Sequence, residues 1–353
     1  MHRRHVLIGG ASLLAVTGCA SAGSLVGGGA PATTLARDAA VARAVLPSQT
    51  PKAELLQKWT GPYGGVPPWD KVSAAKLRQA ILEGIDLQRA EVLAIANNPE
   101  PATFANTLVP MQMAGEPLDR ALSLFGVMTQ NIGSDDYNTV DTEVSPLLSA
   151  ASDEITFNEA LFKRVKAVAD GAAAAGLTAE QTRVATRSRD NFVRNGAALD
   201  AAGKAELGRI NTALSNVFTS FGQKVVADEK TWTVISSQAG TAGMPASNKA
   251  AAAAAARSRG IKGWVIVNTR SSVDPFLTFA DDRGLREKVW RKFVGRGDNG
   301  DANDTNATIA EIVKLAGSVV AEVPTRATRR PLAAEAPMFV TAAEAASLRS
   351  RVG

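Results

Sequence analysis

Apolar side chains recur at helical spacing along most of this chain, and this periodicity constrains the fold more than any other feature. Leu77, Ile81 and Ile85 begin one such stripe, and Ser73 just before them stands in the position of a helix N-cap. Similar stripes predict helices over residues 104–114, 117–130, 136–155, 158–173, 200–224 and 282–294. The pattern predicts a mostly α fold.

Local signals mark two further helix features. Thr178 and Gln181 have the spacing of a capping box and predict a helix start at that point. Within the helix expected over residues 282–294, two oppositely charged pairs are spaced i,i+4: Asp282 with Arg286, and Glu287 with Arg291. We expect both pairs to form on the exposed face of that helix.

Two short segments break the helical pattern. Trp232–Ile235 and Trp264–Val267 are rich in β-branched and aromatic residues, which is typical of strands. An alanine-rich helix is predicted between them over residues 247–259. We therefore expect the two strands to pair and to form a small two-stranded β-element in a multi-helix body.

The N-terminus has the pattern of a bacterial lipoprotein signal. Arg3 and Arg4 precede a short apolar stretch, Val6–Val16, which is too short to span a bilayer, and Cys19 follows it. This predicts a signal peptide over residues 1–18, lipidation of Cys19 and anchoring to the cell envelope, facing the periplasm. Ala20 after the cysteine favours the outer over the inner membrane. The alternative is an ordinary secretory signal with an incidental cysteine.

Composition narrows the classes of partner. The net charge is +5, and removal of Arg3 and Arg4 with the signal would lower it to about +3. This bias is too weak to indicate nucleic acid as a partner. Residues 21–46 are rich in Gly, Ala, Ser and Thr without a sustained period, so residues 19–50 are predicted to be a flexible tether.

Four separated motifs resemble one family, and they occur in that family's order. They are Trp59–Asp70 (WTGPYGGVPPWD), Asn97–Thr107 (NNPEPATFANT), Asn191–Gly196 (NFVRNG) and Asn268–Ile312. They resemble the N-terminal part of the M3 zinc oligopeptidases, the thimet oligopeptidase and peptidyl-dipeptidase group. The resemblance covers residues 51–314. It implies a helical body, oligopeptide substrates, and a zinc-activated water assisted by a glutamate as the catalytic group of the intact family.

The chain lacks the histidines that such chemistry needs. A zinc peptidase of this kind binds its metal through a His-Glu-x-x-His helix, in which two imidazoles lie one turn apart. The histidines of this sequence are His2 and His5, both in the predicted signal. We therefore expect no catalytic residue, no metal ligand and no cofactor in this chain. Triads that use a histidine base are excluded on the same ground.

The resemblance ends near Leu315. From there the sequence is biased towards Ala, Arg and Pro, and Pro324, Pro331 and Pro337 would interrupt a helix. Residues 315–353 are predicted to be an unmatched tail, disordered or read out of frame, outside the packed core.

Three other patterns were weighed as sites. The acidic run Asp298–Asp304 lacks the glycine and the glutamate that an EF-hand loop requires, so a solvated loop that caps the next helix is expected. Arg270, Ser271 and Ser272 follow a strand and could line a peptide channel, but are interpreted as structural. The aromatic residues of the Trp59–Asp70 loop are expected to hold it against the helices, with ligand stacking as the alternative.

Three hypotheses follow for function. The first is a truncated or frameshifted M3 peptidase that is inactive alone. The second is a peptide-binding or regulatory envelope lipoprotein without catalysis. The third is an enzyme completed by a separately encoded zinc-bearing half. Oligopeptides are the partners that the resemblance implies for the intact family.

Overall fold

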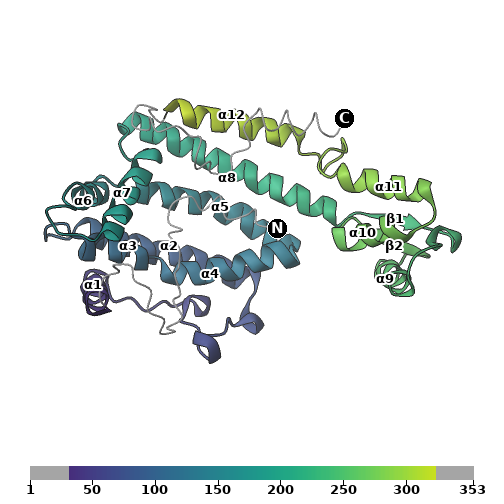
Figure 1. The fold of residues 1–353 in the computed structure, drawn as a ribbon, viewed down its shortest axis with the longest axis horizontal. Helices are drawn as coiled ribbons and strands as arrows, with labels where there is room; N and C mark the ends of the chain where they lie inside the picture. The colour runs from purple at the N-terminus through teal and green to yellow at the C-terminus, as the bar shows by residue number, and fades with distance from the viewer. Residues whose placement is uncertain (1–31, 323–353) are drawn as a thin grey trace. The chain divides into compact units, whose positions relative to one another are not determined.

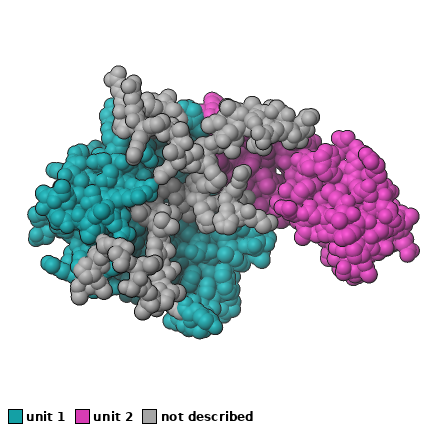
Figure 2. Space-filling model, viewed as in Figure 1, with its two compact units in different colours: residues 1–216, 315–353 teal, residues 217–314 magenta. Residues whose placement is uncertain are grey.

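The structure is a computed structural model that describes residues 32–322 of the 353-residue chain. The chain divides into two units: residues 1–216 with 315–353, and residues 217–314 (Figure 2). The divisions fall within two helices, α8 (Ala201–Glu229) and α12 (Asn306–Glu322). Within the described residues, no helix combines the length and the hydropathy needed to cross a membrane. The predicted signal, Cys19 and residues 323–353 lie outside the described part.

The first unit is built from helices joined by short turns. Its helices are α1 (Ala32–Val45), α2 (Ala74–Ala96), α3 (Val109–Met113), α4 (Glu116–Val127), α5 (Asp135–Phe157), α6 (Glu159–Asp170) and α7 (Ala179–Arg194). Its 3-10 turns are η1 (Glu54–Leu56), η2 (Pro62–Gly64) and η3 (Trp69–Lys71), and its π-helical turns are η4 (Phe104–Leu108) and η5 (Met128–Ile132). Helix α2 packs against both α4 and α5, and α6 packs against α7 (Figure 1).

The core of the first unit follows from the apolar stripe of α2. Leu77 and Ile81 are fully buried and pack with Leu124 of α4 and Val144 of α5. The predicted N-cap is confirmed, since Ser73 Oγ accepts a hydrogen bond from the Lys76 amide at 3.3 Å. The periodicity of the sequence thus fixes which face of α2 is buried.

The capping box is confirmed at the start of α7. Thr178 Oγ1 accepts from the Gln181 amide at 3.2 Å, and Gln181 Oε1 accepts from the Thr178 amide at 3.1 Å. Phe162 of α6 and Phe192 of α7 stack with ring centroids 5.9 Å apart. The caps and the aromatic contact fix α6 and α7 as a helical pair.

The second unit contains the sheet. Strands β1 (Trp232–Ile235) and β2 (Trp264–Val267) pair, as predicted; they are antiparallel, with Trp232 opposite Val267 and Ile235 opposite Trp264. The helices wholly in this unit are α9 (Ala246–Arg257), α10 (Arg270–Phe279) and α11 (Arg283–Val294), and the 3-10 turn η6 (Ala239–Thr241) follows β1. The mostly α fold class with one small β-element is confirmed.

The core of the second unit lies on one face of this sheet. Ile235 and Ile266 lie on that face and are buried with Phe276 of α10 and Val289 of α11. Helices α9 and α10 both pack against β2.

The tether interpretation is wrong for the described part of residues 19–50. Residues 32–45 form helix α1, whose Ala42 is buried, and Val45 and Leu46 pack against a cluster that contains Ile95 and Leu161. Alanine has the highest helix propensity, so this run forms a helix despite its weak apolar period. The segment is docked on the first unit.

The predicted boundary at residue 315 is also wrong within the described residues. Helix α12 continues without a break to Glu322, and Leu315 is buried. A single glycine such as Gly317 costs a helix only about 1 kcal/mol, so it does not end one by itself. The loss of family resemblance near Leu315 therefore falls inside helix α12 and not at its end.

The Trp59–Asp70 loop only partly matches its prediction. Trp59 packs against the core of the first unit, whereas Tyr63 is fully exposed and Trp69 is nearly half exposed. An isolated bridge between Thr60 and Val66 closes the loop, and Tyr63 adopts a left-handed backbone with φ 57°. One aromatic holds the loop to the helices, and the others do not.

Candidate functional site

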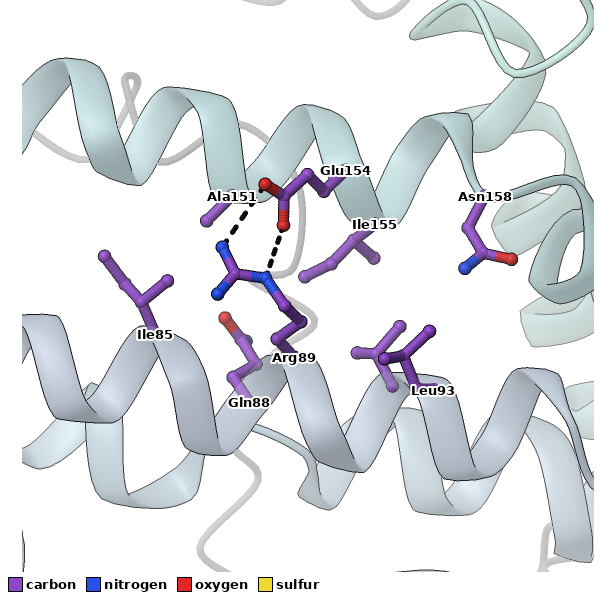
Figure 3. A pocket seen from close by; sticks show the side chains of 9 residues that line it. Ile85, Gln88, Arg89, Leu93, Ala151, Glu154, Ile155 and Asn158 are labelled. Atoms are coloured by element: carbon purple, nitrogen blue, oxygen red, sulfur yellow. Dashed lines mark hydrogen bonds and ion pairs between the residues drawn. The ribbon is translucent and has the colours of Figure 1, made fainter.

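A groove lies between α2 and α5 in the first unit and has a cavity volume of about 130 Å³ (Figure 3). Apolar side chains from both helices form much of its lining, including Ile85 and Leu93 of α2 and Ala151 and Ile155 of α5. Its lining residues are Ile85, Gln88, Arg89, Val92, Leu93, Ala151, Glu154, Ile155 and Asn158. The groove offers space for a small apolar group.

An ion pair crosses this α2–α5 groove. Arg89 Nε donates to Glu154 Oε2 at 2.7 Å and Arg89 Nη2 donates to Glu154 Oε1 at 3.2 Å, so the two side chains point towards each other (Figure 3). Arg89 Nη1 also donates to Asp86 at 2.6 Å. The hydrogen bond to Glu154 raises the pKa of the Arg89 guanidinium. These groups balance each other's charge, and none of them is a nucleophile paired with a base.

A second groove lies within the second unit, between α9, β2 and α10. Its cavity volume is about 300 Å³. Its lining residues are Met244, Asn248, Ala251, Ala252, Ala255, Val265, Ile266, Ser271, Ser272, Pro275 and Phe276. Small side chains on α9 leave this space open beside the strand. The α9–α10 groove combines an apolar floor with hydroxyl and amide groups, which suits an uncharged or peptide-like ligand better than a metal.

Part of the Arg270–Ser272 segment lines this second groove. All three residues belong to the first turn of α10, and Ser271 and Ser272 line the groove. Ser272 Oγ accepts a hydrogen bond from the Val267 amide at 3.1 Å. Arg270 instead forms an exposed ion pair with Asp274 at 2.8 Å. The structural interpretation fits Ser272, which ties α10 to β2, and Ser271 lines the groove with its Oγ 3.3 Å from Thr269 Oγ1.

The Asp298–Asp304 loop closes on itself. Asp304 accepts from the amides of Gly300 and Asn306, both at 2.9 Å, and Asp298 accepts from the Asn306 side chain at 2.5 Å. These hydrogen bonds lower the pKa of Asp304, the amide of Asn306 being the largest cause. Asp304 thus binds the first amide of α12, in line with the predicted loop that caps the next helix.

Of the two charged pairs predicted in α11, one forms. Glu287 accepts from Arg291 at 2.9 Å, as expected. The prediction of an Asp282–Arg286 pair is wrong. Asp282 is the N-cap of α11 and accepts from the Leu285 amide at 2.9 Å. Arg286 donates to the carbonyls of Ala280 and Asp281. The first amides of a helix have no acceptor within the helix, so a carboxylate at the N-cap accepts from them and not from a side chain one turn further on.

The described residues do not fit the zinc ion that the family resemblance implies. His2, His5 and Cys19, the nitrogen and sulfur donors that the sequence offers, lie outside residues 32–322. Within those residues, no three His, Cys, Asp or Glu side chains are grouped as metal ligands. The donor set needed for a tetrahedral zinc site is therefore not in the described part.

Buried polar anchors are the features that sequence reasoning missed. Asp228 is 1% exposed and accepts from the Gly297 amide at 2.8 Å and from Asn299 at 3.0 Å. Arg164 is also buried and donates to the carbonyls of Asn98 and Glu100, both at 2.8 Å. The one sequence signal for the second anchor is the NNPEPATFANT turn, whose carbonyls need a donor but whose letters do not say which residue supplies it.

Comparison with known proteins finds similar sequences among bacterial peptidases. It is 34% identical over 251 residues to the dipeptidyl carboxypeptidase of Escherichia coli, a match that covers 70% of this chain and 37% of that protein. It is 32% identical over 263 residues to the dipeptidyl carboxypeptidase of Salmonella typhimurium, covering 74% of this chain and 38% of the relative. Oligopeptidase A of Escherichia coli is 26% identical over 255 residues, covering 71% and 38%.

These matches set the scope of the assignment. The chain spans well under half the length of the curated relatives it matches. No protein-family model matches the sequence. The motifs that resemble oligopeptidases and the similarity over about 70% of the chain agree: over that stretch the chain is homologous to the front part of dipeptidyl carboxypeptidases and oligopeptidase A, which are M3-family peptidases.

Proposed function

We propose that this chain is the helical, non-catalytic portion of an M3-type oligopeptidase, and that it binds short peptides without hydrolysing them by itself. The observation that carries the proposal is the homology to dipeptidyl carboxypeptidases over 251 residues, which spans 37% of the Escherichia coli protein. The relatives are named for acting on peptides, so peptides are the proposed ligand class here.

The two grooves support binding rather than chemistry. The α2–α5 groove has an apolar floor below a neutralised ion pair, and the α9–α10 groove adds a serine hydroxyl beside a strand. Peptide ligands commonly use such a combination of apolar contacts and a few polar groups. Hydrolysis would need an activated water, which a bound zinc ion supplies in this family. Side chains grouped to bind such an ion are not found within residues 32–322.

The proposal is tested on the full purified chain. After equilibration with zinc chloride and removal of free metal, elemental analysis is expected to find no stoichiometric zinc. A panel of short peptides is expected to remain intact when followed by chromatography, while equilibrium dialysis detects their binding. Chelator-sensitive release of dipeptides would overturn the non-catalytic part of the proposal, and a panel that neither binds nor is cleaved would overturn the peptide-binding part.

Localisation forms a separate part of the proposal. We propose that Cys19 carries a lipid that anchors the chain to the cell envelope, facing the periplasm. The support is the order of Arg3 and Arg4, the apolar stretch Val6–Val16 and the cysteine. Stable anchoring needs more than one acyl chain, which a diacylated and amide-acylated cysteine provides.

A further inference from the structure

Among residues 32–322, no strand pairs with the outer edge of β1 in the second unit. The Asn268 amide donates to the Thr231 carbonyl at 2.9 Å, one position before Trp232 pairs with Val267. Antiparallel ladders alternate between pairs that exchange hydrogen bonds and pairs that do not. Thr233 and Ile235 therefore direct their main-chain groups towards β2, whereas Trp232 and Val234 direct theirs away from it.

The exposure of these residues follows the same alternation. Trp232 and Val234 are 39% and 40% exposed, while Thr233 and Ile235 are 5% and 1% exposed. Helices α9 and α10 both pack on β2, the other strand. The main-chain donors and acceptors of the β1 edge are therefore available to a ligand, and its inward side chains are locked in the core.

The β1 edge is held rigid at its start. Thr231 Oγ1 donates to the Asp228 carbonyl at 2.7 Å, and Asn268 Nδ2 donates to the same carbonyl at 3.3 Å. Asp228 in turn accepts from the Gly297 amide at 2.8 Å. A preorganised edge loses little conformational entropy when another strand adds to it.

A positively charged side chain lies beside the first residue of the β1 edge. The Arg259 guanidinium lies over the Trp232 ring, 5.2 Å from its centroid. Arg257 and Lys262 are exposed nearby in sequence, and none of the three forms an ion pair within the described residues. A carboxylate on a ligand would find at Arg259 a cation already positioned by an aromatic ring.

We infer that the β1 edge binds an extended peptide segment as a third strand, with a carboxylate of that segment held by Arg259. The inference rests on the proposed peptide-binding function and names a site and a ligand chemistry for it. Main-chain hydrogen bonds to Trp232 and Val234 supply affinity, as in other cases of strand addition. The charge disfavours a second copy of this chain as the occupant, since pairing β1 with β1 would bring two Arg259 side chains to one sheet.

The carboxylate has two possible sources, which the probes separate. One fluorescent threonine- and valine-rich peptide ends in a free carboxylate and has no acidic side chain. A second is amidated and carries one glutamate, and a third is amidated with glutamine in its place. A fourth repeats the better binder with alternate main-chain amides methylated, which removes the donors of one edge without removing a side chain.

The experiment measures binding of these peptides to the full chain by fluorescence anisotropy. One or both carboxylate peptides are expected to bind about tenfold more tightly than the glutamine peptide. The Arg259→Gln variant should abolish that difference, and amide methylation should weaken binding at least tenfold. Arg270→Gln, an exposed arginine of the same unit, is the matched control and should leave binding unchanged.

A second variant addresses the main-chain contacts on the protein side. Val234→Pro removes an amide that points away from β2, where an edge strand tolerates proline, and circular dichroism checks that the fold is kept. It should weaken binding at least tenfold. If peptides bind the Val234→Pro variant as tightly as the original chain, and if methylated peptides bind as tightly as unmethylated ones, the strand site is refuted. The proposal that the chain binds peptides is then unaffected. Absence of binding by every peptide overturns both proposals, and peptide-independent dimers lost in Val234→Pro would show that a second copy occupies the edge.

Discussion

Asp153 of α5 and Asn211 of α8 meet inside the first unit, where Asn211 Nδ2 donates to Asp153 Oδ1 at 2.7 Å. The other carboxyl oxygen, Asp153 Oδ2, is buried without a hydrogen-bond partner among the described residues. Burial raises the pKa of Asp153 to about 6, and the bond from Asn211 opposes the rise only in part. The pair joins two long helices through a carboxyl group that resists ionisation.

This carboxyl group makes stability depend on pH. The folded protein holds the proton up to about pH 6, whereas an unfolded aspartate releases it near pH ~3.9. The folded state therefore binds more protons between these values, and the free energy of unfolding falls as pH rises from about 4 to about 6. Two pH units correspond to at most ~3 kcal/mol, which partial exposure reduces to about 1–2 kcal/mol. Urea unfolding at a series of pH values measures it.

The variant Asp153→Asn should flatten this part of the profile, because an amide does not titrate there. Asp170→Asn is the control: Asp170 is exposed, and its hydrogen bond and ion pair with Lys166 lower its pKa, so its effect lies below pH ~4. A profile as steep in Asp153→Asn as in the original chain would show that another group causes the slope.

The sequence predicted the elements whose signals are local. The stripe through Leu77 and Ile81, the cap at Ser73 and the strand pair at Trp232 and Trp264 all rest on patterns within a few residues. In such elements the spacing of apolar side chains along the chain is enough to predict the type of element and which of its faces is buried.

Contacts between distant segments left no such signal. Arg164 and Asn106 are 58 positions apart, as are Asp153 and Asn211, and neither pair follows from composition or spacing. Helix α1 was missed because alanine packs without producing a strong apolar period. The β1 edge required the register of the sheet, which the two strand signals do not contain by themselves.

Arg164 is predicted to be a main anchor of the first unit. Besides the carbonyls of Asn98 and Glu100, it donates to Asn106 Oδ1 at 2.9 Å and to Thr107 Oγ1 at 3.2 Å. Arg164→Ala removes all of these hydrogen bonds, including those to the buried side chains of Asn106 and Thr107, so the free energy of unfolding should fall by about 2–4 kcal/mol. Chemical denaturation followed by circular dichroism measures the loss.

An exposed arginine provides the comparison for Arg164. Arg209 pairs with Glu206 on the surface of α8 at 2.6 Å, and such pairs contribute little. Arg209→Ala should change stability by less than about 0.5 kcal/mol. Equal losses in the two variants would mean that the buried hydrogen bonds of Arg164 do not set the stability of this region.

Lipidation predicts a change that is independent of the fold. Cys19→Ser removes the thiol that would carry the lipid, so incorporation of a labelled fatty acid in bacteria should be lost and the chain should leave the membrane fraction. Ser21→Ala changes a neighbouring residue and should leave both readouts unchanged. Labelling that survives Cys19→Ser would refute the lipoprotein assignment.

Gly84 of α2 lies against Leu118 of α4, and its substitution gives a test of the helix packing. A Cβ at this position would lie 2.9 Å from Leu118 Cδ1 and 3.1 Å from Leu118 Cα. The Leu118 side chain can rotate, but its Cα cannot move unless the two helices separate. Overpacking of this kind costs about 1–3 kcal/mol, which exceeds the gain of up to ~1 kcal/mol from replacing glycine by alanine in a helix.

Gly84→Ala should therefore lower the free energy of unfolding by about 1 kcal/mol, as measured by chemical denaturation. Gly126 lies in α4, and the nearest atom to a Cβ built there is Gln130 Nε2 at 3.8 Å. Gly126→Ala thus keeps the gain in helix propensity without the overpacking, and it should stabilise the chain by up to about 1 kcal/mol. The opposite signs of the two substitutions separate packing from propensity. Stabilisation by both would mean that α2 and α4 do not approach each other as closely as Gly84 and Leu118 do in this structure.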